Sequence, residues 1–205
     1  MEAWQRAYHK YKMANNWDNR VRFIVRYIYD VDNNGFLDKN DFESMAFRST
    51  VLEGKGTLEA TRQKTNTKLY MDLWDKIAEL CDFDRNGEVT VDEFKEGMKQ
   101  ICANKTIIQL PKEFRDFIAA SFAQIDINGD GLIGIEEFRV DCVNRLAFKD
   151  SNAIDASFEA LLSEEDRKKG GIDLKTYQEL YAAFIGSQDA TNRAVHLFGP
   201  LPELS

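Results

Sequence analysis

Apolar residues recur at helical spacing in four segments of this 205-residue chain, and a polar stretch follows each segment. Residues three and four positions apart lie on one face of a helix, so this spacing is typical of amphipathic helices. After each polar stretch, an aromatic residue opens the apolar face of a further helix. The pattern therefore predicts a helix–loop–helix unit that occurs four times, with first helices at residues 17–29, 69–81, 114–125 and, more weakly, 154–162.

The second polar stretch, residues 82–93, has oxygen-bearing side chains at its first, third, fifth, ninth and twelfth positions and glycine at its sixth. Carboxylates this close together repel one another unless a cation lies among them. The spacing is that of the twelve-residue calcium loop, in which the seventh residue contributes its backbone carbonyl. The candidate ligands are Asp82, Asp84, Asn86, the Glu88 carbonyl, Thr90 and Glu93.

The same spacing occurs in two further stretches, which makes coincidence an inadequate explanation. Residues 30–41 offer Asp30, Asp32, Asn34, the Phe36 carbonyl, Asp38 and Asp41. Residues 126–137 offer Asp126, Asn128, Asp130, the Leu132 carbonyl, a water over Gly134, and Glu137. The eighth residue of each loop normally forms a short strand that pairs with a second loop, so the units are expected in twos. These residues are Leu37, Val89 and Ile133.

A fourth stretch, residues 165–176, keeps the features needed for pairing and lacks those needed for binding. Its sixth and eighth positions are Gly170 and Ile172, whereas basic Arg167 and Lys169 stand where acidic ligands belong. Thr176 replaces the bidentate carboxylate at position twelve, and a register shifted by one residue makes no better site. We expect a structural fourth unit that binds no metal.

Composition agrees with a folded, acidic protein whose charge belongs to its loops. The chain is 43% hydrophobic and 12% aromatic, and its net charge is −8. This balance disfavours nucleic acid and anionic membrane surfaces as partners. The carboxylates among the candidate ligands outnumber the net negative charge, so the rest of the chain is slightly basic. Three bound divalent ions would bring the protein to about −2.

Other residue types argue against secretion, membrane insertion and catalysis. Cys81, Cys102 and Cys142 form an odd set without metal-ligand spacing, which indicates buried reduced thiols in an intracellular protein. No stretch resembles a signal peptide or approaches the roughly 20 apolar residues of a membrane span. His9 and His196 lie in the terminal segments, away from any nucleophile pattern. The sequence therefore predicts a cytoplasmic protein that is not an enzyme.

The predicted units divide the chain into four parts. Residues 1–16 form an N-terminal extension, in which Trp4, Ala7, Tyr8 and Tyr11 share one helical face. Residues 17–104 and 105–186 form two pairs of units, and residues 187–205 form a tail whose apolar residues pack on the body. Residues 51–66 are expected to be a loop with some helix. The short connection 104–111 contains Ile107, Ile108 and Leu110, so we expect it to pack and to hold both pairs in one compact body.

Several stretches together resemble the sarcoplasmic calcium-binding proteins of invertebrates, and especially the arthropod form. They span nearly the whole chain from Trp17: WDNR from residue 17, RYIYDVDNNGFLDKNDF from 26, NGEVTVDEFK from 86, DINGDG from 126, EDRKKGG from 165, YQELY from 177 and LFGPL from 197. The resemblance implies an all-α protein of four EF-hands in two pairs, with short β pairing between loops. It also implies three working sites, a silent fourth, and buffering of calcium with some magnesium binding in muscle and neuronal cytosol.

Two other functions share these features, namely a calcium sensor and a calcium-triggered photoprotein-like enzyme. A sensor opens a Met-rich groove on binding calcium, and this chain has five Met against fourteen Phe. A photoprotein relies on pocket histidines, and this chain has two, both terminal. We therefore predict a buffer of calcium ions (Ca2+) with no obligate protein target, and a homodimer is left open. Competing Mg2+ should bind most readily in loop 30–41, where the shorter Asp41 replaces glutamate at position twelve.

Overall fold

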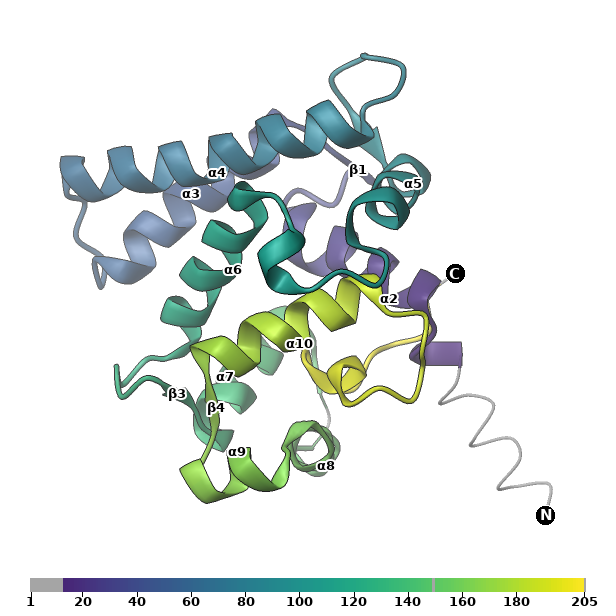
Figure 1. The fold of residues 1–205 in the computed structure, drawn as a ribbon. Coiled ribbons are helices and arrows are strands. Elements are labelled where there is room, and N and C mark those ends of the chain that lie inside the picture. Colours follow the sequence, from purple (N-terminus) through teal and green to yellow (C-terminus); the bar gives the residue numbers. More distant parts are fainter. Residues whose placement is uncertain (1–12, 149, 205) are drawn as a thin grey trace.

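The computed structural model describes residues 13–148 and 150–204, most of which are helical (Figure 1). The first half of the chain contains two helix–loop–helix units, which we name hand one and hand two. Hand one comprises α2 (Trp17–Ile24), the π-helical turn η1 (Val25–Tyr29), β1 (Phe36–Leu37) and α3 (Lys39–Glu53). Hand two comprises α4 (Ala60–Cys81), β2 (Val89–Thr90) and α5 (Val91–Cys102).

The second half contains hands three and four, which follow a short 3-10 turn, η2 (Ile107–Gln109). Hand three comprises α6 (Lys112–Ile125), β3 (Leu132–Ile133) and α7 (Ile135–Arg145). Hand four comprises α8 (Asn152–Leu161), the short helix α9 (Glu164–Lys169), β4 (Ile172–Asp173) and α10 (Leu174–Gly186). A further 3-10 turn, η3 (Arg193–His196), lies in the tail.

Two-residue antiparallel strands join the hands in twos. In the first pair Leu37 lies opposite Val89, and in the second pair Ile133 lies opposite Ile172. All four are the eighth residues of their loops, and each is buried with at most 2% of its surface exposed. These positions confirm the predicted pairing of hands through their loops.

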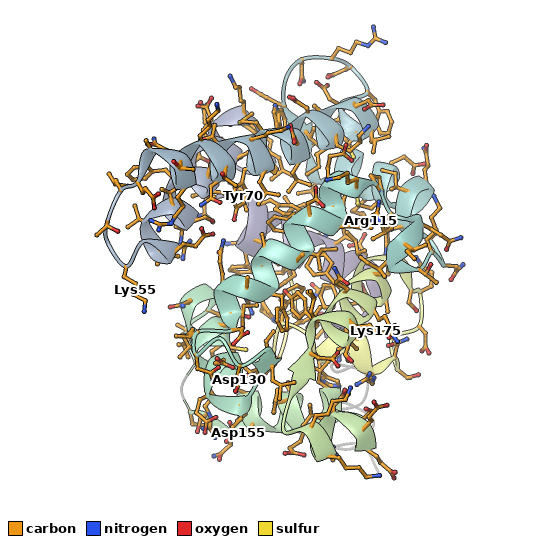
Figure 2. All side chains as sticks on the ribbon, turned by 60° about the vertical axis from the view of Figure 1, so that its left-hand side comes forward. Lys55, Tyr70, Arg115, Asp130, Asp155 and Lys175 are labelled. Atoms are coloured by element: carbon orange, nitrogen blue, oxygen red, sulfur yellow. The ribbon has the colours of Figure 1, made fainter. Side chains whose placement is uncertain are left out.

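Aromatic side chains hold the two pairs in one body. Tyr29 ends hand one's first helix, and its ring lies 5.8 Å from that of Phe42, 5.9 Å from that of Phe94 and 5.4 Å from that of Phe117. Its hydroxyl also lies 3.3 Å from the hydroxyl of Tyr181 in hand four. One buried ring thus contacts all four hands, and side chains fill the space between the ribbons (Figure 2).

A second junction joins the start of α2 to the end of α10. The indole nitrogen of Trp17 donates to the carbonyl of Ile185 at 2.7 Å. The guanidinium of Arg20 is fully buried and donates to the carbonyls of Phe184, at 2.6 Å, and Ser187. These carbonyls belong to the last turn of α10 and to the residue that directly follows it, where positive charge is favourable. Hand one is therefore fastened to hand four as well as to hand two.

The tail returns across this junction, and its last described residues lie beside α2 (Figure 1). Leu197 and Phe198 are almost completely buried, and Leu201 and Leu204 pack against the core at partial exposure. The backbone amide of Leu204 donates to the side-chain carbonyl of Asn19 at 2.8 Å. The tail thereby completes the core between the two pairs.

The structure differs from the sequence predictions at two places. Residues 51–66 are mostly helical, because α3 continues to Glu53 and α4 already begins at Ala60. In the connection between pairs, Leu110 is buried and Ile107 is partly buried, but Ile108 is 78% exposed, so packing was wrongly expected of it. Residues 1–12, which hold most of the predicted extension and His9, lie outside the described residues. The limits 17–104 and 105–186 stay predictions.

The three cysteines are all buried and unpaired by disulfides. Burial raises the pKa of each thiol to about 12, which keeps it protonated and unreactive at neutral pH. Within the described residues, no helix is both long and apolar enough to cross a membrane.

Candidate metal sites

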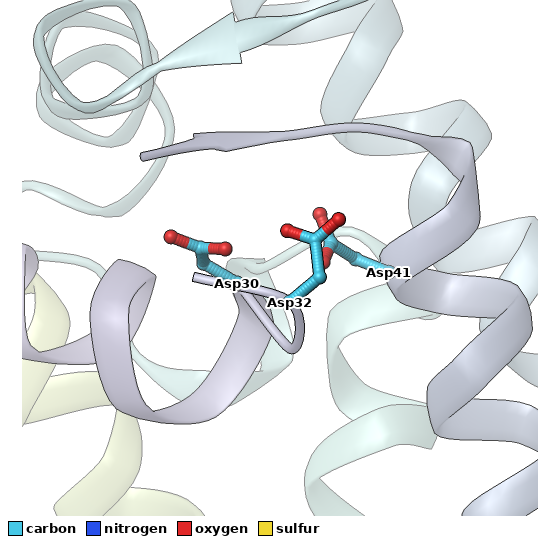
Figure 3. Close-up of side chains that lie close together, drawn as sticks. All are labelled: Asp30, Asp32 and Asp41. Atoms are coloured by element: carbon cyan, nitrogen blue, oxygen red, sulfur yellow. The ribbon is translucent and has the colours of Figure 1, made fainter. Parts of the chain in front are cut away.

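The first loop gathers three carboxylates around one space (Figure 3). Oxygens of Asp30, Asp32 and Asp41 lie within 4.8 Å of one another. Asp30 and Asp41 are buried, with 6% and 1% of their surfaces exposed, and Asp32 is exposed. Burial raises the pKa of Asp30 and of Asp41, although backbone amides that donate to these carboxylates oppose the shift. Like-charged acids held this way favour a cation among them.

The second loop gathers a similar cluster, made of Asp82, Asp84 and Glu93, again with oxygens within 4.8 Å of one another. This cluster is more open to solvent than the first, because Asp84 is exposed and the other two are partly exposed. The twelfth residue is glutamate, and its carboxylate accepts the backbone amide of Thr90 at 2.9 Å.

The third loop has the same frame with an amide in place of one acid. Among the described residues of this loop, the structure forms no equally tight set of three carboxylates, because Asn128 stands at the third position. Glu137 is 8% exposed, and its two carboxylate oxygens accept backbone amides of Ile127 at 2.9 Å and Gly134 at 3.0 Å. Asp130 lies on the outer surface of the loop after α6 (Figure 2).

A shared set of backbone hydrogen bonds shapes all three loops. In each, the first-position carboxylate accepts the amides of the fifth and sixth residues, and the fifth-position side chain accepts the amide of the seventh. The distances to Asp30 are both 3.1 Å, those to Asp82 are 3.2 and 3.0 Å, and those to Asp126 are 3.1 and 3.0 Å. The seventh-residue amides lie 3.1, 2.7 and 2.9 Å from Asn34, Asn86 and Asp130.

The sharp turn in each loop depends on glycine at the sixth position. Gly35, Gly87 and Gly131 have φ values of +97°, +85° and +84°. Residues with a Cβ atom rarely adopt this left-handed backbone conformation, whereas glycine adopts it without strain. The turn brings the first, third and fifth side chains to one side, which is the arrangement that an oxygen-liganded cation requires.

Ninth-position side chains have a second role at the start of the exit helix. Asp38 caps α3 by accepting the amide of Asn40 at 2.7 Å, and Thr90 caps α5 by accepting the amide of Glu93 at 3.3 Å. Gly134 has no side chain to contribute at this position. The carbonyls of Phe36, Glu88 and Leu132 are the predicted seventh-position metal ligands. Phe36 and Leu132 lie in β1 and β3, and Glu88 directly precedes β2.

The fourth unit does not form a calcium loop at all. Residues 164–169 form α9, a helix that occupies the positions where the first ligands would lie. Ser163 begins this helix as a cap, and Asp166 accepts the hydroxyl of Ser163 at 2.6 Å. This capping pair could be read in the sequence as Ser, two residues, then an acid.

Basic side chains of the protein pair with several acids of hand four. Buried Asp166 accepts a hydrogen bond from the guanidinium of Arg193 in η3 at 2.7 Å. The ammonium of Lys169 lies 2.8 Å from Asp173 and 3.1 Å from Glu165. Among its described residues, hand four shows no cluster of three acids like those of the first two loops.

Comparison with known proteins agrees with this geometry. Residues 118–143 match the EF hand family. The chain is 50% identical over 191 residues to sarcoplasmic calcium-binding protein 1 of Astacus leptodactylus, which covers 93% of this chain and 100% of that relative. The structure of an amphioxus sarcoplasmic calcium-binding protein superposes with a TM-score of 0.73 at 27% identity, over 88% of this chain and 96% of the other.

Calcium-loaded apo-aequorin from Aequorea victoria superposes with a TM-score of 0.60, over 85% of this chain and 92% of that chain. At 17% identity, this similarity concerns the fold alone. The four-hand fold, the loop geometry and the 50% identity along almost the entire chain lead to one conclusion. The chain belongs to the family of sarcoplasmic calcium-binding proteins.

Proposed function

We propose that this protein buffers calcium through three sites, in loops 30–41, 82–93 and 126–137, and that hand four binds no ion. The observation that carries the proposal is the backbone frame shared by the three loops. It holds their acids ready for a cation, whereas a helix and internal basic residues replace it in hand four. The relatives' names support calcium as the ion.

Magnesium competes at these sites in the proposal, most readily in loop 30–41. Magnesium requires octahedral geometry at roughly 2.0–2.1 Å, whereas calcium takes more ligands at roughly 2.3–2.6 Å. Asp41 is one methylene shorter than the glutamate at the same position in the other loops, so it reaches the ion less easily with both oxygens. Asp41 is also 1% exposed and exchanges capping hydrogen bonds with Asp38 at the start of α3, which limits how far it can shift toward the ion.

Buffering is favoured over signalling because the core is aromatic and its side chains contact all four hands. A sensor hand opens on binding calcium. Here opening would have to separate Tyr29 from the rings of Phe94 in hand two and Phe117 in hand three. A cavity of about 680 Å³ does lie between α3, α6 and α7, lined by apolar residues such as Met45, Leu52, Phe117 and Val140. In a buffer, this cavity has the same form in the magnesium and calcium states.

The proposed partners are calcium ions. The proposal includes no nucleic acid, no membrane and no obligate protein target, and in it the protein is not an enzyme. The name of the relatives places them in the sarcoplasm, and we propose the cytoplasm of muscle for this chain too.

Native mass spectrometry at saturating calcium counts the sites, and calorimetric titration with and without millimolar magnesium tests competition. We expect three calcium ions and a smaller apparent calcium affinity with magnesium present. A fourth ion that is lost when Glu165 or Asp173 is replaced would overturn the assignment of hand four.

A further inference from the structure

The ammonium of Lys169 bridges the two ends of the fourth loop. Lys169 stands at the fifth position of that loop, where the other loops carry Asn or Asp. It lies 3.1 Å from Glu165 at the first position and 2.8 Å from Asp173 at the ninth. A metal ion in the other loops would join the same parts, namely the start of the loop and the residue that caps the exit helix.

Asp173 is the point at which this bridge reaches the strand. Its side chain accepts the amide of Thr176 at 2.8 Å and thereby caps α10. Hydrogen bonds from Lys169 and Thr176 lower the pKa of Asp173 to about 2, so its carboxylate stays charged over the whole physiological range. Lys169 therefore fixes β4 and the start of α10 relative to α9 without a metal.

The pairing of β4 with β3 connects Asp173 directly to loop three. Asp173 lies opposite Leu132, and the carbonyl of Leu132 is the predicted seventh-position ligand of that loop. Gly171, next to β4, lies so close that a Cβ atom there would be 2.6 Å from the carbonyl oxygen of Ile133. The two loops are thus in tight contact at the point where loop three offers its backbone ligand.

Arg193 holds the other end of the same unit. It joins buried Asp166 in α9 to the carbonyl of Leu161 at the end of α8, at distances of 2.7 and 2.6 Å. Hand four therefore has cations of its own at both ends of α9.

In the first pair of hands, both loops are candidate metal sites, so neither strand is held by a loop of the hand-four type. There Phe36, the seventh residue of loop one, lies opposite Thr90, the ninth residue of loop two. Both strands of that ladder belong to loops whose acids are clustered around a candidate ion. Without metal, repulsion among those acids acts on both strands, whereas in the second pair it acts on one.

We propose that Lys169 is a tethered cation that replaces the metal of hand four and positions loop three for calcium. It is a positioning residue, because it acts through Asp173 and touches no ion. If β4 is already ordered before calcium binds, calcium binding at loop three has a smaller conformational-entropy cost. The inference rests on the third site of the proposed function. Since Lys169 and Asp173 are about one-third exposed, the expected effect is about two- to fivefold in affinity at site three.

The test is a calcium titration of the full-length protein followed by NMR through the amides of Gly35, Gly87 and Gly131, one in each loop. Lys169→Met should weaken binding reported by Gly131 about two- to fivefold and leave the other two midpoints unchanged. Lys169→Arg should keep the calcium affinity reported by Gly131 at the wild-type value. The control is Lys175→Met, since Lys175 is 85% exposed on α10 and its ammonium lies 3.9 Å from Glu179 on the same helix.

An unchanged Gly131 midpoint in Lys169→Met, or equal weakening in all three loops, would overturn the proposal. The metal-free wild-type protein gives a second test that needs no variant. Cross-strand signals between Ile133 and Ile172 should persist there, while those between Leu37 and Val89 should be lost. Loss of both would also contradict the proposal. Failure of Gly131 to respond to calcium at all would instead remove the third site from the proposed function.

Discussion

Replacing Phe198 with alanine measures how much the C-terminal tail contributes to the fold. The Phe198 ring is 2% exposed and lies 4.9 Å from Phe184, 5.5 Å from Tyr181 and 6.0 Å from Phe23. The guanidinium of Arg145 lies 5.0 Å from its centre. These partners come from α10, α2 and α7, so the ring joins both pairs of hands.

The expected loss is about 3–5 kcal/mol, the range for removing a buried phenylalanine and leaving a cavity. Each aromatic pair adds about 0.5–1.5 kcal/mol beyond buried area, which favours the upper part of that range. For a chain of this size, about 2–4 °C of melting temperature corresponds to each kcal/mol, so the melting temperature should fall by about 6–20 °C.

The assay is guanidinium unfolding at saturating calcium, followed by circular dichroism. Phe47→Ala is the matched control, because Phe47 lies on α3 and is 53% exposed. It should change stability by at most about 0.5 kcal/mol. If the unfolding free energies of the two variants differ by less than about 1 kcal/mol, the tail is not part of the core in solution.

Three further changes test separate parts of the structure. Asp41→Glu should raise the calcium preference of loop one, measured as weaker magnesium competition in calorimetry; unchanged competition would contradict the size argument for Asp41. Arg20→Met should cost about 2–4 kcal/mol in chemical unfolding, because carbonyls at the end of α10 lose their charged donor; a loss below about 0.5 kcal/mol would show that water replaces it. Burial lowers the pKa of His196 below its ordinary 6.5, so between the two values the unfolded chain binds more protons than the folded one. Stability should therefore fall as the pH drops through 6.5, and by less in His196→Gln; equal pH dependence in both proteins would refute that role.

The calcium loops and their pairing could be predicted because metal geometry fixes the residue types at set positions. A residue such as Leu37 or Ile172 is aliphatic for the strand, and Gly35 is required by the turn, so both are recognisable without any tertiary information. The same spacing identified the acids that cluster in the first two loops.

The early start of α4 was missed because its first nine residues, ATRQKTNTK, contain no apolar periodicity. Tertiary contacts stabilise this segment instead. The side-chain amide of Asn66 donates to Thr50 at 3.3 Å and to Glu53 at 3.1 Å, both on α3. Such contacts between polar side chains leave no pattern in the sequence of either helix.

For hand four, the sequence predicts no metal site, but it did not reveal the helix α9 that the structure forms there. The capping pair of Ser163 and Asp166 was readable, but the calcium-loop frame suggested a loop over the same residues. Arg193, the basic partner of Asp166, lies 27 residues further along the chain. A pairing at that distance depends on how the tail folds back, which local sequence does not specify.

The most direct test of the buffer proposal is the fluorescence of a hydrophobic dye such as ANS in the metal-free, magnesium and calcium states. Each ion stabilises the fold by about 2.7 kcal/mol at a hundredfold excess over its Kd, so the metal-free protein should be the loosest and bind the most dye. We expect nearly equal, low fluorescence in the magnesium and calcium states. Strong dye binding that appears only when calcium replaces magnesium would show that the protein opens a surface as a sensor does.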